Sequence, residues 1–357
     1  MNGMMDMQIK KITPKEYRDF IDMNALDYKM LQAPEYAALR KGTIYAGLNQ
    51  DGRISHAVIV ESRPAMKMWN FAYSAAGYLS ANEQEDKAFL DALAQALKKD
   101  KYILWQMESS KELREYDRKG NPVEGGRDNR DYLAFMEADG FTWTDLGQGY
   151  NPAHQMTWQS RIDLTDKKVF DQIWAGFTGN RRRDVKYARK NNLTFEVYKP
   201  GEMNEELWQA FGSLMEKSAD YQGYDDGTLD SHKNFLNAYG DDHARIGIVW
   251  TQDHEPAYAG AWILSNGQMM YLYSGMDRAF SKLCPTALAQ ATMIEKALDE
   301  GFKEYNFGAI SGYFNEGEEG FGVFKMKENF GAVVYRTIGP LTKPLNSMGR
   351  IFQKRMV

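Results

Sequence analysis

Six cationic side chains lie within ten residues near the middle of the chain. They are Arg181, Arg182, Arg183, Lys186, Arg189 and Lys190. If the stretch is helical, four of these side chains lie near one face: Arg182, Lys186, Arg189 and Lys190. That density of cations suits contacts with phosphate groups. A solvated basic face of a helix is the alternative and accounts for the composition equally well. Tyr187, in the same stretch, is expected to pack against the protein rather than to stack on a ligand.

A second group with chemical potential lies in the glycine-rich stretch 320–331. There Phe324 is apolar, and Lys325 is a cation that follows a glycine-rich turn. A fixed ammonium in a dry site stabilises the negative charge that develops on oxygen during acyl transfer. The alternative is that Lys325 and Lys327 are ordinary exposed lysines, and without the surrounding pattern that alternative is favoured.

Length and composition limit the kinds of protein that this chain can be. A chain of 357 residues favours two domains, and its 43% hydrophobic residues can form substantial cores. The net charge of −5 means that any site for a polyanion must be a local patch. One cysteine excludes an intramolecular disulfide and fits a reducing compartment. The five histidines have no metal-site spacing, so no metal is expected, and the sequence gives no reason to expect a cofactor.

Targeting signals are not apparent in the sequence. No apolar run approaches the roughly 20 residues that span a bilayer. The first ten residues lack the apolar core of a signal peptide. We therefore expect a cytoplasmic protein.

The hydrophobic pattern predicts the order "strands, helix, strand" twice. In the first half we expect strands at 8–12, 43–48, 55–61, 69–73 and 102–107, helices from Pro14 and at 34–40, 82–99 and 131–138, and a loop at 108–130. In the second half we expect helices at 166–191, 204–218, 231–239 and 286–300, and strands at 193–198, 245–250, 257–264, 269–274 and 304–309. This order favours an α+β fold with two GNAT-like domains, at 1–150 and 151–340, followed by a tail at 341–357.

Two signatures in this sequence resemble the Fem family. The pattern YNFGAIS … GFGVFK … FG over residues 305–331 resembles the C-terminal signature of that family, and NRRRDVKYARKNNLTFEV over residues 180–197 is similar to its arginine-rich helix and following strand. The resemblance implies transfer of an amino acid from aminoacyl-tRNA onto the peptide stem of a peptidoglycan precursor. The absence of a long helical insertion between Phe195 and Ser274 points to the armless, FemX-like subgroup.

The resemblance also assigns roles to residues. Phe324 and Lys325 match the Phe-Lys pair of the family and are the catalytic candidates, while the six cations at 181–190 become candidates for contacts with tRNA. Arg40 and Lys41 correspond to a basic position that meets the diphosphate of the precursor, although cations at the end of a helix are also favourable for its dipole. The other substrate-binding candidates are Tyr221, Tyr224, Tyr271 and Tyr273.

The sequence departs from the family at two positions. The stretch 73–80 has no carboxylate where the family has an Asp, so the general base is not identified, and water or the substrate itself can take the proton. The family also has an Arg after the helix that follows the basic strand, where Tyr221 and Tyr224 stand as substitute hydrogen-bond donors. The transferred amino acid, a lipid-linked or nucleotide-linked acceptor and the oligomeric state all remain open.

Two other functions fit parts of the sequence. An acyl-CoA-dependent N-acyltransferase needs a glycine-rich loop before a helix to hold the pyrophosphate, and the corresponding loop at 278–285 has no glycine. A non-enzymatic RNA-binding protein would use the basic stretch and would leave the stretch around Phe324 without a role.

The tail at 341–357 is basic and amphipathic. Its cations are Lys343, Arg350, Lys354 and Arg355, and its apolar residues are Leu345, Met348, Ile351, Phe352 and Met356. Cations next to an apolar face give weak attachment to an anionic membrane surface. The alternative, which we favour slightly, is a terminal helix docked on the second domain.

Overall fold

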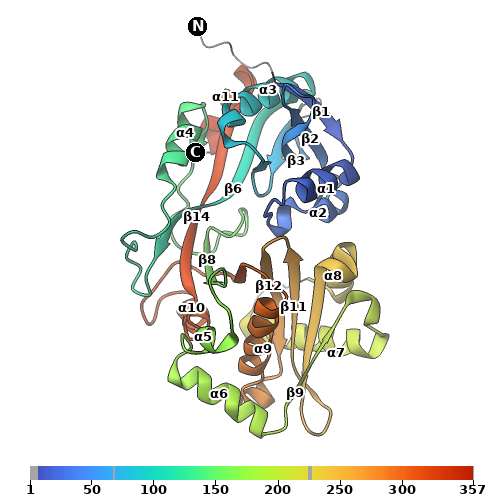
Figure 1. Ribbon diagram of the computed structural model, residues 1–357, viewed down its shortest axis with the longest axis vertical. Helices are drawn as coiled ribbons and strands as arrows, with labels where there is room; N and C mark the ends of the chain where they lie inside the picture. Colours follow the sequence, from blue (N-terminus) through green and yellow to red (C-terminus); the bar gives the residue numbers. More distant parts are fainter. Residues whose placement is uncertain (1–6, 67–68, 224–226, 357) are drawn as a thin grey trace. The chain divides into compact units, whose positions relative to one another are not determined.

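The computed structural model describes residues 7–66, 69–223 and 227–356 (Figure 1). The chain divides into two compact units. The first unit comprises Met1–Gln159, Ser311–Tyr313 and Tyr335–Val357, and the second comprises Ser160–Ile310 and Phe314–Val334. These units differ from the domains expected at 1–150 and 151–340, because the chain returns to the first unit after residue 334.

The first unit is built on one sheet. Its strands lie in the order β1 (Gln8–Ile12), β2 (Thr43–Leu48), β3 (Ile54–Met66), β4 (Trp69–Ser74), β6 (Tyr102–Tyr116) and β14 (Val333–Pro344), while β5 (Tyr78–Ser80) pairs with β3 and β7 (Thr142–Trp143) with β14. The successive pairs from β1 to β4 are antiparallel, whereas β4 and β6 are parallel. Parallel neighbours require a crossover connection, and α3 (Asp86–Lys99) supplies it.

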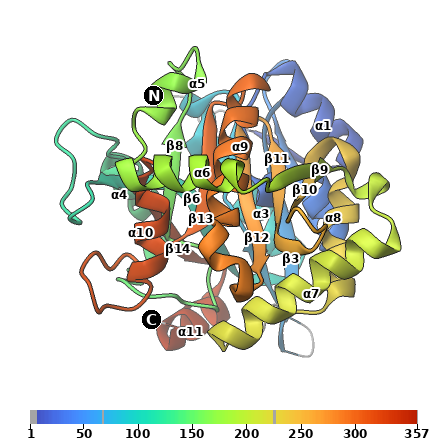
Figure 2. The ribbon, with the colours of Figure 1, turned by 90° about the horizontal axis from the view of Figure 1, so that it is seen from below.

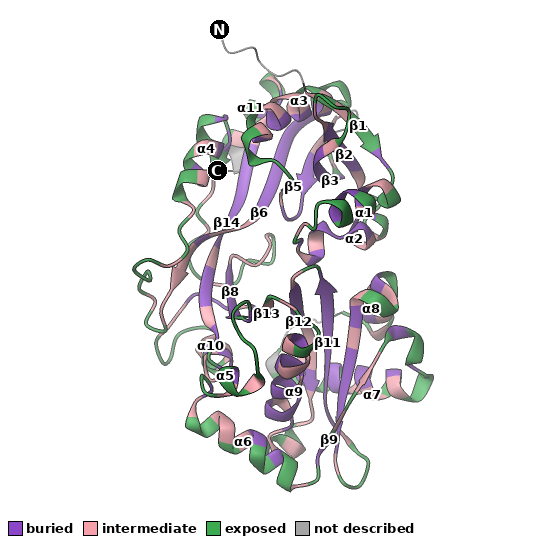
Figure 3. Ribbon diagram, in the orientation of Figure 1, coloured by how far each residue is buried: buried purple, intermediate pink, exposed green. Residues whose placement is uncertain are grey.

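The helices of the first unit cover this sheet with apolar residues. α3 buries Phe89, Leu93 and Leu97 in a cluster that includes Trp105 of β6. The remaining helices are α1 (Pro14–Met23), α2 (Pro34–Leu39), α4 (Arg130–Ala138) and α11 (Ser347–Met356), with 3₁₀ turns η1 (Met30–Gln32) and η2 (Glu83–Glu85). Figure 3 shows the buried strands and the exposed outer sides of these helices. α1 begins with the predicted capping box, in which Thr13 and Glu16 each accept a hydrogen bond from the other's backbone N–H.

The second unit repeats this plan. Its strands lie in the order β8 (Trp158–Asp163), β13 (Glu304–Ala309), β12 (Gln268–Met276), β11 (Pro256–Ser265), β10 (Ala244–Trp250) and β9 (Thr194–Tyr198). β9 to β12 are antiparallel, and β12 and β13 are parallel. α9 (Pro285–Asp299) is the crossover between β12 and β13, as the sequence predicted.

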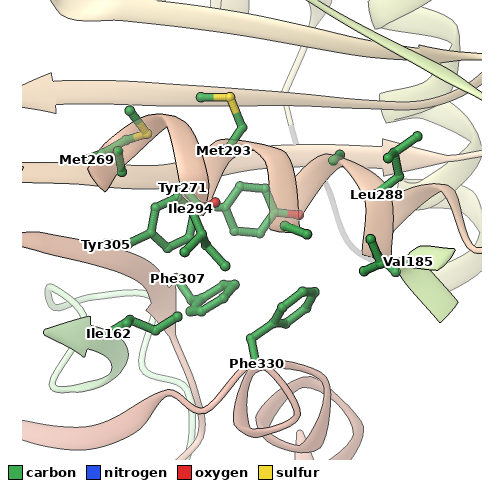
Figure 4. Packing of buried hydrophobic residues seen from close by; sticks show 14 of the residues in the cluster. Ile162, Val185, Met269, Tyr271, Leu288, Met293, Ile294, Tyr305, Phe307 and Phe330 are labelled. Carbon is green, nitrogen blue, oxygen red and sulfur yellow. The ribbon is translucent and has the colours of Figure 1, made fainter. Parts of the chain in front are cut away.

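Helices cover both faces of the second sheet. α6 (Gly179–Lys190) packs on α9, where Val185 and Leu288 come from the two helices (Figure 4), and residues of both helices join Trp262 and Leu264 of β11 in one apolar core. α7 (Glu205–Gln222) and α8 (Leu229–His243) pack on the opposite face of β11 from α9. α5 (Phe170–Trp174), α10 (Phe321–Glu328), η3 (Pro200–Glu202) and η4 (Arg278–Leu283) complete the unit. Because α7 and α8 lie against the sheet, they do not form a projecting arm, which agrees with the armless prediction.

One glycine of β12 is required by the close approach of α7. A Cβ at Gly275 would lie 2.2 Å from the carbonyl oxygen of Leu214, which belongs to the backbone of α7. A backbone atom cannot move aside as the end of a side chain can. Gly275 therefore sets the distance between α7 and the sheet.

The structure corrects several sequence-based expectations. Residues 108–116 continue β6 rather than opening a loop, because the strand stays paired, with bridges from Arg114 to Asp128 and from Tyr116 to Pro122. The expected helix at 166–191 is two helices, α5 and α6. β8 and β14 were not predicted, and the tail begins inside β14 rather than after it.

Candidate functional site

The glycine-rich stretch forms the short helix α10 of the second unit. Gly320 precedes it with a φ of 73°, a left-handed conformation that glycine adopts without strain. Phe324 is 2% exposed, and its ring lies edge-on to that of Phe314 with 5.1 Å between centroids. Phe324 therefore anchors α10 in the protein, which is a packing role.

Lys325 points to solvent. Half of its side chain is exposed, and its Nζ lies 2.6 Å from Glu328 Oε2 in an ion pair along the helix. Its charge is thus hydrated and already compensated by a carboxylate. The assignment of Lys325 as the catalytic cation stays a prediction, and these surroundings give it little support.

Lys327, two residues later, is buried. It is 4% exposed, and its Nζ donates a hydrogen bond of 2.5 Å to the carbonyl oxygen of Ala309, at the end of β13. Burial lowers the pKa of Lys327 from 10.5 to about 7, and among the described residues no acidic neighbour raises it again. The hydrogen bond to Ala309 uses one of the three donors of the ammonium group. A buried lysine with such a pKa has the properties of a functional group rather than of a surface lysine.

α10 is connected to the basic helix α6. Thr178, the N-cap of α6, donates from its backbone N–H to the carbonyl oxygen of Asn329 at 3.0 Å and from its hydroxyl to Asn329 Oδ1 at 3.2 Å. Phe330 follows, packed against Phe307 (Figure 4) and also against Phe177 in the core of the second unit. The two signatures found in the sequence therefore meet at the start of α6.

The structure divides the six basic residues of α6 into two groups. Arg181 lies over the ring of Phe330, 4.6 Å from its centroid, and burial lowers its pKa. Arg182 Nη1 donates to the carbonyl oxygens of Trp174, Ala175 and Phe177 at 3.3, 3.1 and 2.7 Å. These two arginines hold the end of α5 and the start of α6. The exposed members are Arg183, Lys186, Arg189 and Lys190.

Tyr187 is also exposed, at 48%. The expectation that it packs against the protein is therefore wrong. On α6, Val185 and Ala188 face the core, and Tyr187 falls on the other side of the helix.

Tyr271 and Tyr273 do not form a common site. β12 has a bulge, in which Trp262 pairs with Tyr271 but the preceding Ala261 pairs with Tyr273. Tyr271 is buried and accepts a hydrogen bond of 3.0 Å from Tyr258, on the side of α9. Tyr273 instead lies 4.5 Å from His232 of α8, between ring centroids. The bulge places the two side chains on opposite faces of the sheet.

Tyr221 lies at the end of α7 and is 66% exposed, with the guanidinium of Arg278 3.9 Å from its ring centroid. Tyr224 lies outside the described residues. Both roles remain predictions.

Arg40 lies at the end of α2 in the first unit. Its Nε is 3.1 Å from Glu61 Oε2, while Tyr36 donates a hydrogen bond of 2.6 Å to Glu61 Oε1. Glu61 is buried, and about half of the Arg40 side chain is exposed. Lys41, the next residue, is exposed and has a φ of 52°. Arg40 is thus oriented by a buried carboxylate and keeps donors free towards solvent.

A buried carboxyl of the first unit was missed in the sequence. Glu108 on β6 is 1% exposed, and its Oε1 lies 2.7 Å from Nδ1 of His154, which is partly exposed. Its Oε2 has no hydrogen-bond partner among the described residues, and burial raises the pKa of Glu108. The sequence did contain a signal, since Glu108 directly follows the apolar strand expected at 102–107. Because we expected a loop from residue 108, we did not consider that this carboxylate could be buried.

The first unit also contains a cavity of about 240 Å³. Its lining includes both acidic and basic side chains, among them Glu83, Asp86, Lys111 and Glu112, together with Tyr78 and Tyr132. Asp86 is fixed by hydrogen bonds from Tyr78 at 2.6 Å and from Ser80 at 2.8 Å. Charges of both signs around one cavity suit a ligand that carries both amines and carboxylates.

Comparison with known proteins identifies the family. The family model described as "FemAB family" matches residues 12–252 and 248–352. The chain belongs to the FemAB family. This confirms the resemblance that the two sequence signatures indicated.

Named relatives align with nearly the whole chain. Aminoacyltransferase FemA of Staphylococcus aureus (strain NCTC 8325 / PS 47) is 22% identical over 410 aligned positions, which cover 95% of this chain and 96% of that protein. FemA of S. aureus strain bovine RF122 / ET3-1 gives the same identity and coverage. The alignment is longer than this chain of 357 residues, so FemA contains segments that this chain lacks.

Solved structures confirm the α+β fold of two GNAT-like domains. The crystal structure of FemX superposes with a TM-score of 0.80 at 17% identity and covers 98% of this chain and 99% of FemX. A tandem GNAT protein from the clavulanic acid biosynthesis pathway superposes with a TM-score of 0.52 at 11% identity, covering 95% and 99% of the two chains. At these identities the superpositions support the fold alone.

The C-terminal helix packs on the first unit rather than on the second. Phe352 meets Phe71 edge-on, with 5.5 Å between ring centroids, and the backbone of Gly349 lies against that of Ile103. Met348 and Ile351 remain exposed beside Arg350 and Lys354. None of the helices in residues 7–66, 69–223 and 227–356 combines the length and apolarity needed to cross a membrane.

Proposed function

We propose that this FemAB protein moves an amino acid from aminoacyl-tRNA onto the stem-peptide amine of a peptidoglycan precursor, which builds an interpeptide bridge. Its enzyme class follows from the family and from the FemA relatives: the chain is an aminoacyltransferase, as the sequence predicted. The observation that carries the proposed chemistry is Lys327, a buried lysine in the C-terminal signature with a pKa of about 7.

The reaction is the aminolysis of an ester. The acceptor amine attacks the ester carbonyl, a C–N bond forms, and the bond from the carbonyl carbon to the ribose oxygen breaks. Negative charge develops first on the carbonyl oxygen and then on the departing ribose oxygen, which finally takes a proton. An ammonium in a dry environment stabilises this charge far better than one in water. A pKa near the working pH also suits proton donation to the ribose oxygen.

Lys327 fits this role better than Lys325 does. The Lys325 ammonium is half exposed and paired with Glu328, so solvent and a carboxylate already stabilise its charge. Lys327 is buried, and within the part of the chain that the structure describes its Nζ donates to a neutral carbonyl oxygen, which uses one of the three donors of the ammonium group. Lys327, the second lysine of the stretch, therefore meets the chemical requirements of this step better.

The attacking amine must lose a proton, and Glu108 with His154 has the chemistry to accept it. A carboxyl whose pKa is raised by burial is a stronger base than an exposed one. His154 is partly exposed and hydrogen-bonded to Glu108, so it can pass the proton to solvent.

The substrates are assigned by charge. The exposed cations of α6 bind phosphates of the tRNA, and Arg40, oriented by Glu61, binds the diphosphate of the precursor. The cavity of the first unit, with charges of both signs, accommodates the stem peptide. The protein acts in the cytoplasm, and the exposed side of α11 makes reversible contact with the anionic inner face of the membrane.

The alternatives have less support. In an acyl-CoA enzyme, the loop before α9 would hold a pyrophosphate, but residues 278–283 form η4 and contain no glycine. A purely RNA-binding protein would have no use for the buried lysine of α10.

One assay separates the three functions. The protein is incubated with a muropeptide precursor and with either charged tRNA or an acyl-CoA, and the products are identified by mass. We expect an aminoacyl addition that depends on charged tRNA. Product formed only from acyl-CoA, or RNA binding with no product from either donor, would contradict the proposal.

A further inference from the structure

The outer side of α6 has a composition that its packing does not explain. Arg183, Lys186, Tyr187 and Lys190 stand at positions i, i+3, i+4 and i+7, so they share one face of the helix. All four are exposed. We call this face the Tyr187 stripe. In Figure 2, α6 crosses in front of α9, with its length open to solvent on the viewer's side.

The fold does not need the charges of the Tyr187 stripe. Arg181 and Arg182 already connect α6 to Phe330 and to the end of α5, and Val185 and Ala188 supply the contacts with the core. Within the described residues, the acid nearest in sequence, Asp184, is paired with Arg181 at 3.3 Å rather than with a member of the stripe. The stripe therefore presents uncompensated positive charge.

Tyr187 adds an open aromatic ring to this charge. Its side chain is about half exposed, and no aromatic ring of the described residues is stacked on it. An exposed ring contributes little to folding, whereas the flat face of a nucleobase stacks on such a ring with considerable gain. From Arg183 to Lys190 the helix rises roughly 10 Å, which is enough to place cations on both sides of a stacked base.

We infer that the Tyr187 stripe binds an unpaired segment of RNA, with one base stacked on Tyr187 and the flanking phosphates bound by Arg183, Lys186 and Lys190. This rests on the proposed function, because the RNA in question is the unpaired part of the aminoacyl-tRNA donor. A base inside a duplex cannot offer its face to a side chain, so a stacking residue selects single strands. A membrane surface fits less well, because the stripe has no aliphatic side chain that could enter the acyl region.

The test measures binding of the full-length chain by fluorescence anisotropy. The probes are a labelled single-stranded RNA of twelve nucleotides and an RNA duplex of the same length, and vesicles with anionic lipid are measured by co-sedimentation. We expect preference for the single strand. Tyr187→Ala should weaken single-strand binding about tenfold or more, and Tyr187→Phe, which keeps the ring, should restore most of it.

The salt dependence separates stacking from charge. Tyr187→Ala removes no cation, so the slope of log K against log salt should stay unchanged. Lys186→Gln and Lys190→Gln should each reduce the slope by roughly 0.7, the value for single strands. Circular dichroism of each variant shows whether α6 and the fold survive the substitution.

Several results would overturn the inference. Equal binding of single strand and duplex, equal affinity of the wild type and Tyr187→Ala, or binding to vesicles without binding to RNA would each do so. Transfer activity distinguishes this failure from failure of the proposed function. If the wild type transfers the amino acid but Tyr187→Ala binds RNA normally, only the stripe is wrong. If the single strand binds as expected but no transfer occurs, the stripe stands and the proposed function fails.

Discussion

Replacing Lys327 by methionine should change how the stability of the protein depends on pH. The substitution keeps the length of the side chain and removes the ionisable group. In the folded wild type, burial lowers the pKa of Lys327 to about 7, whereas the unfolded chain keeps a value near 10.5. Between these two values the unfolded state binds a proton that the folded state does not. Stability of the wild type therefore rises with pH in this window, and it is lowest below pH 7, where the folded protein must bury a charged ammonium.

The size of the effect follows from the two pKa values. Each pH unit inside the window adds about 1.36 kcal/mol, so the two units from pH 7 to pH 9 add about 2.7 kcal/mol. Lys327→Met lacks this contribution. Its other effects, such as the lost hydrogen bond to Ala309, do not depend on pH and cancel when the same pair of proteins is compared at two pH values.

Urea unfolding at pH 6 and pH 9, followed by tryptophan fluorescence, measures this difference. The free energy of unfolding of the wild type minus that of Lys327→Met should increase by about 2.7 kcal/mol between the two pH values. Lys325→Met is the matched control and should show almost no such increase, because Lys325 is half exposed and ion-paired at the surface. A difference for Lys327→Met that is no larger than that of the control would refute the reasoning about the buried ammonium.

Three further outcomes are expected. Gly275→Ala should destabilise the protein by about 1–3 kcal/mol in thermal or urea unfolding, because its Cβ meets the backbone of α7, while Gly179→Ala, with open space around it, should have little effect. Glu108→Gln should lower the rate of transfer by about 10²–10⁴-fold with the fold intact by circular dichroism, and an unchanged rate would remove Glu108 from the mechanism. Replacing both Arg350 and Lys354 by Gln should abolish co-sedimentation with anionic vesicles at low salt; binding equal to that of the wild type would make α11 purely structural.

The sequence predicted best those elements whose signals are local. The capping box at Thr13, the crossover helix α9 and most of the strands follow from patterns within one turn or one strand. β14 was missed because its pairing partners lie far away in the chain, and its residues 333–344 have no strong alternation. Residues 108–116 carry several charges, so they resemble a loop, although the structure keeps them in β6.

The site was predicted in outline but not in detail. The signature at 320–331 was recognised, yet Lys325 and Lys327 are two residues apart, and only packing distinguishes the exposed side chain from the buried one. In the same way, Arg181 and Arg183 look equivalent in a basic run, but one lies on Phe330 and the other faces solvent. The bulge in β12 that separates Tyr271 from Tyr273 has no marker in the sequence.

The central claim is that Lys327 is the cation that stabilises the charge of the transfer reaction. Its most direct test is the single-turnover rate of transfer from charged tRNA, measured for Lys327→Met and Lys325→Met at saturating acceptor, with circular dichroism to establish that both variants fold. The account predicts a loss of about 10²–10³-fold for Lys327→Met and a rate within a few-fold of the wild type for Lys325→Met. Near-wild-type transfer by Lys327→Met, or a large loss confined to Lys325→Met, would contradict it.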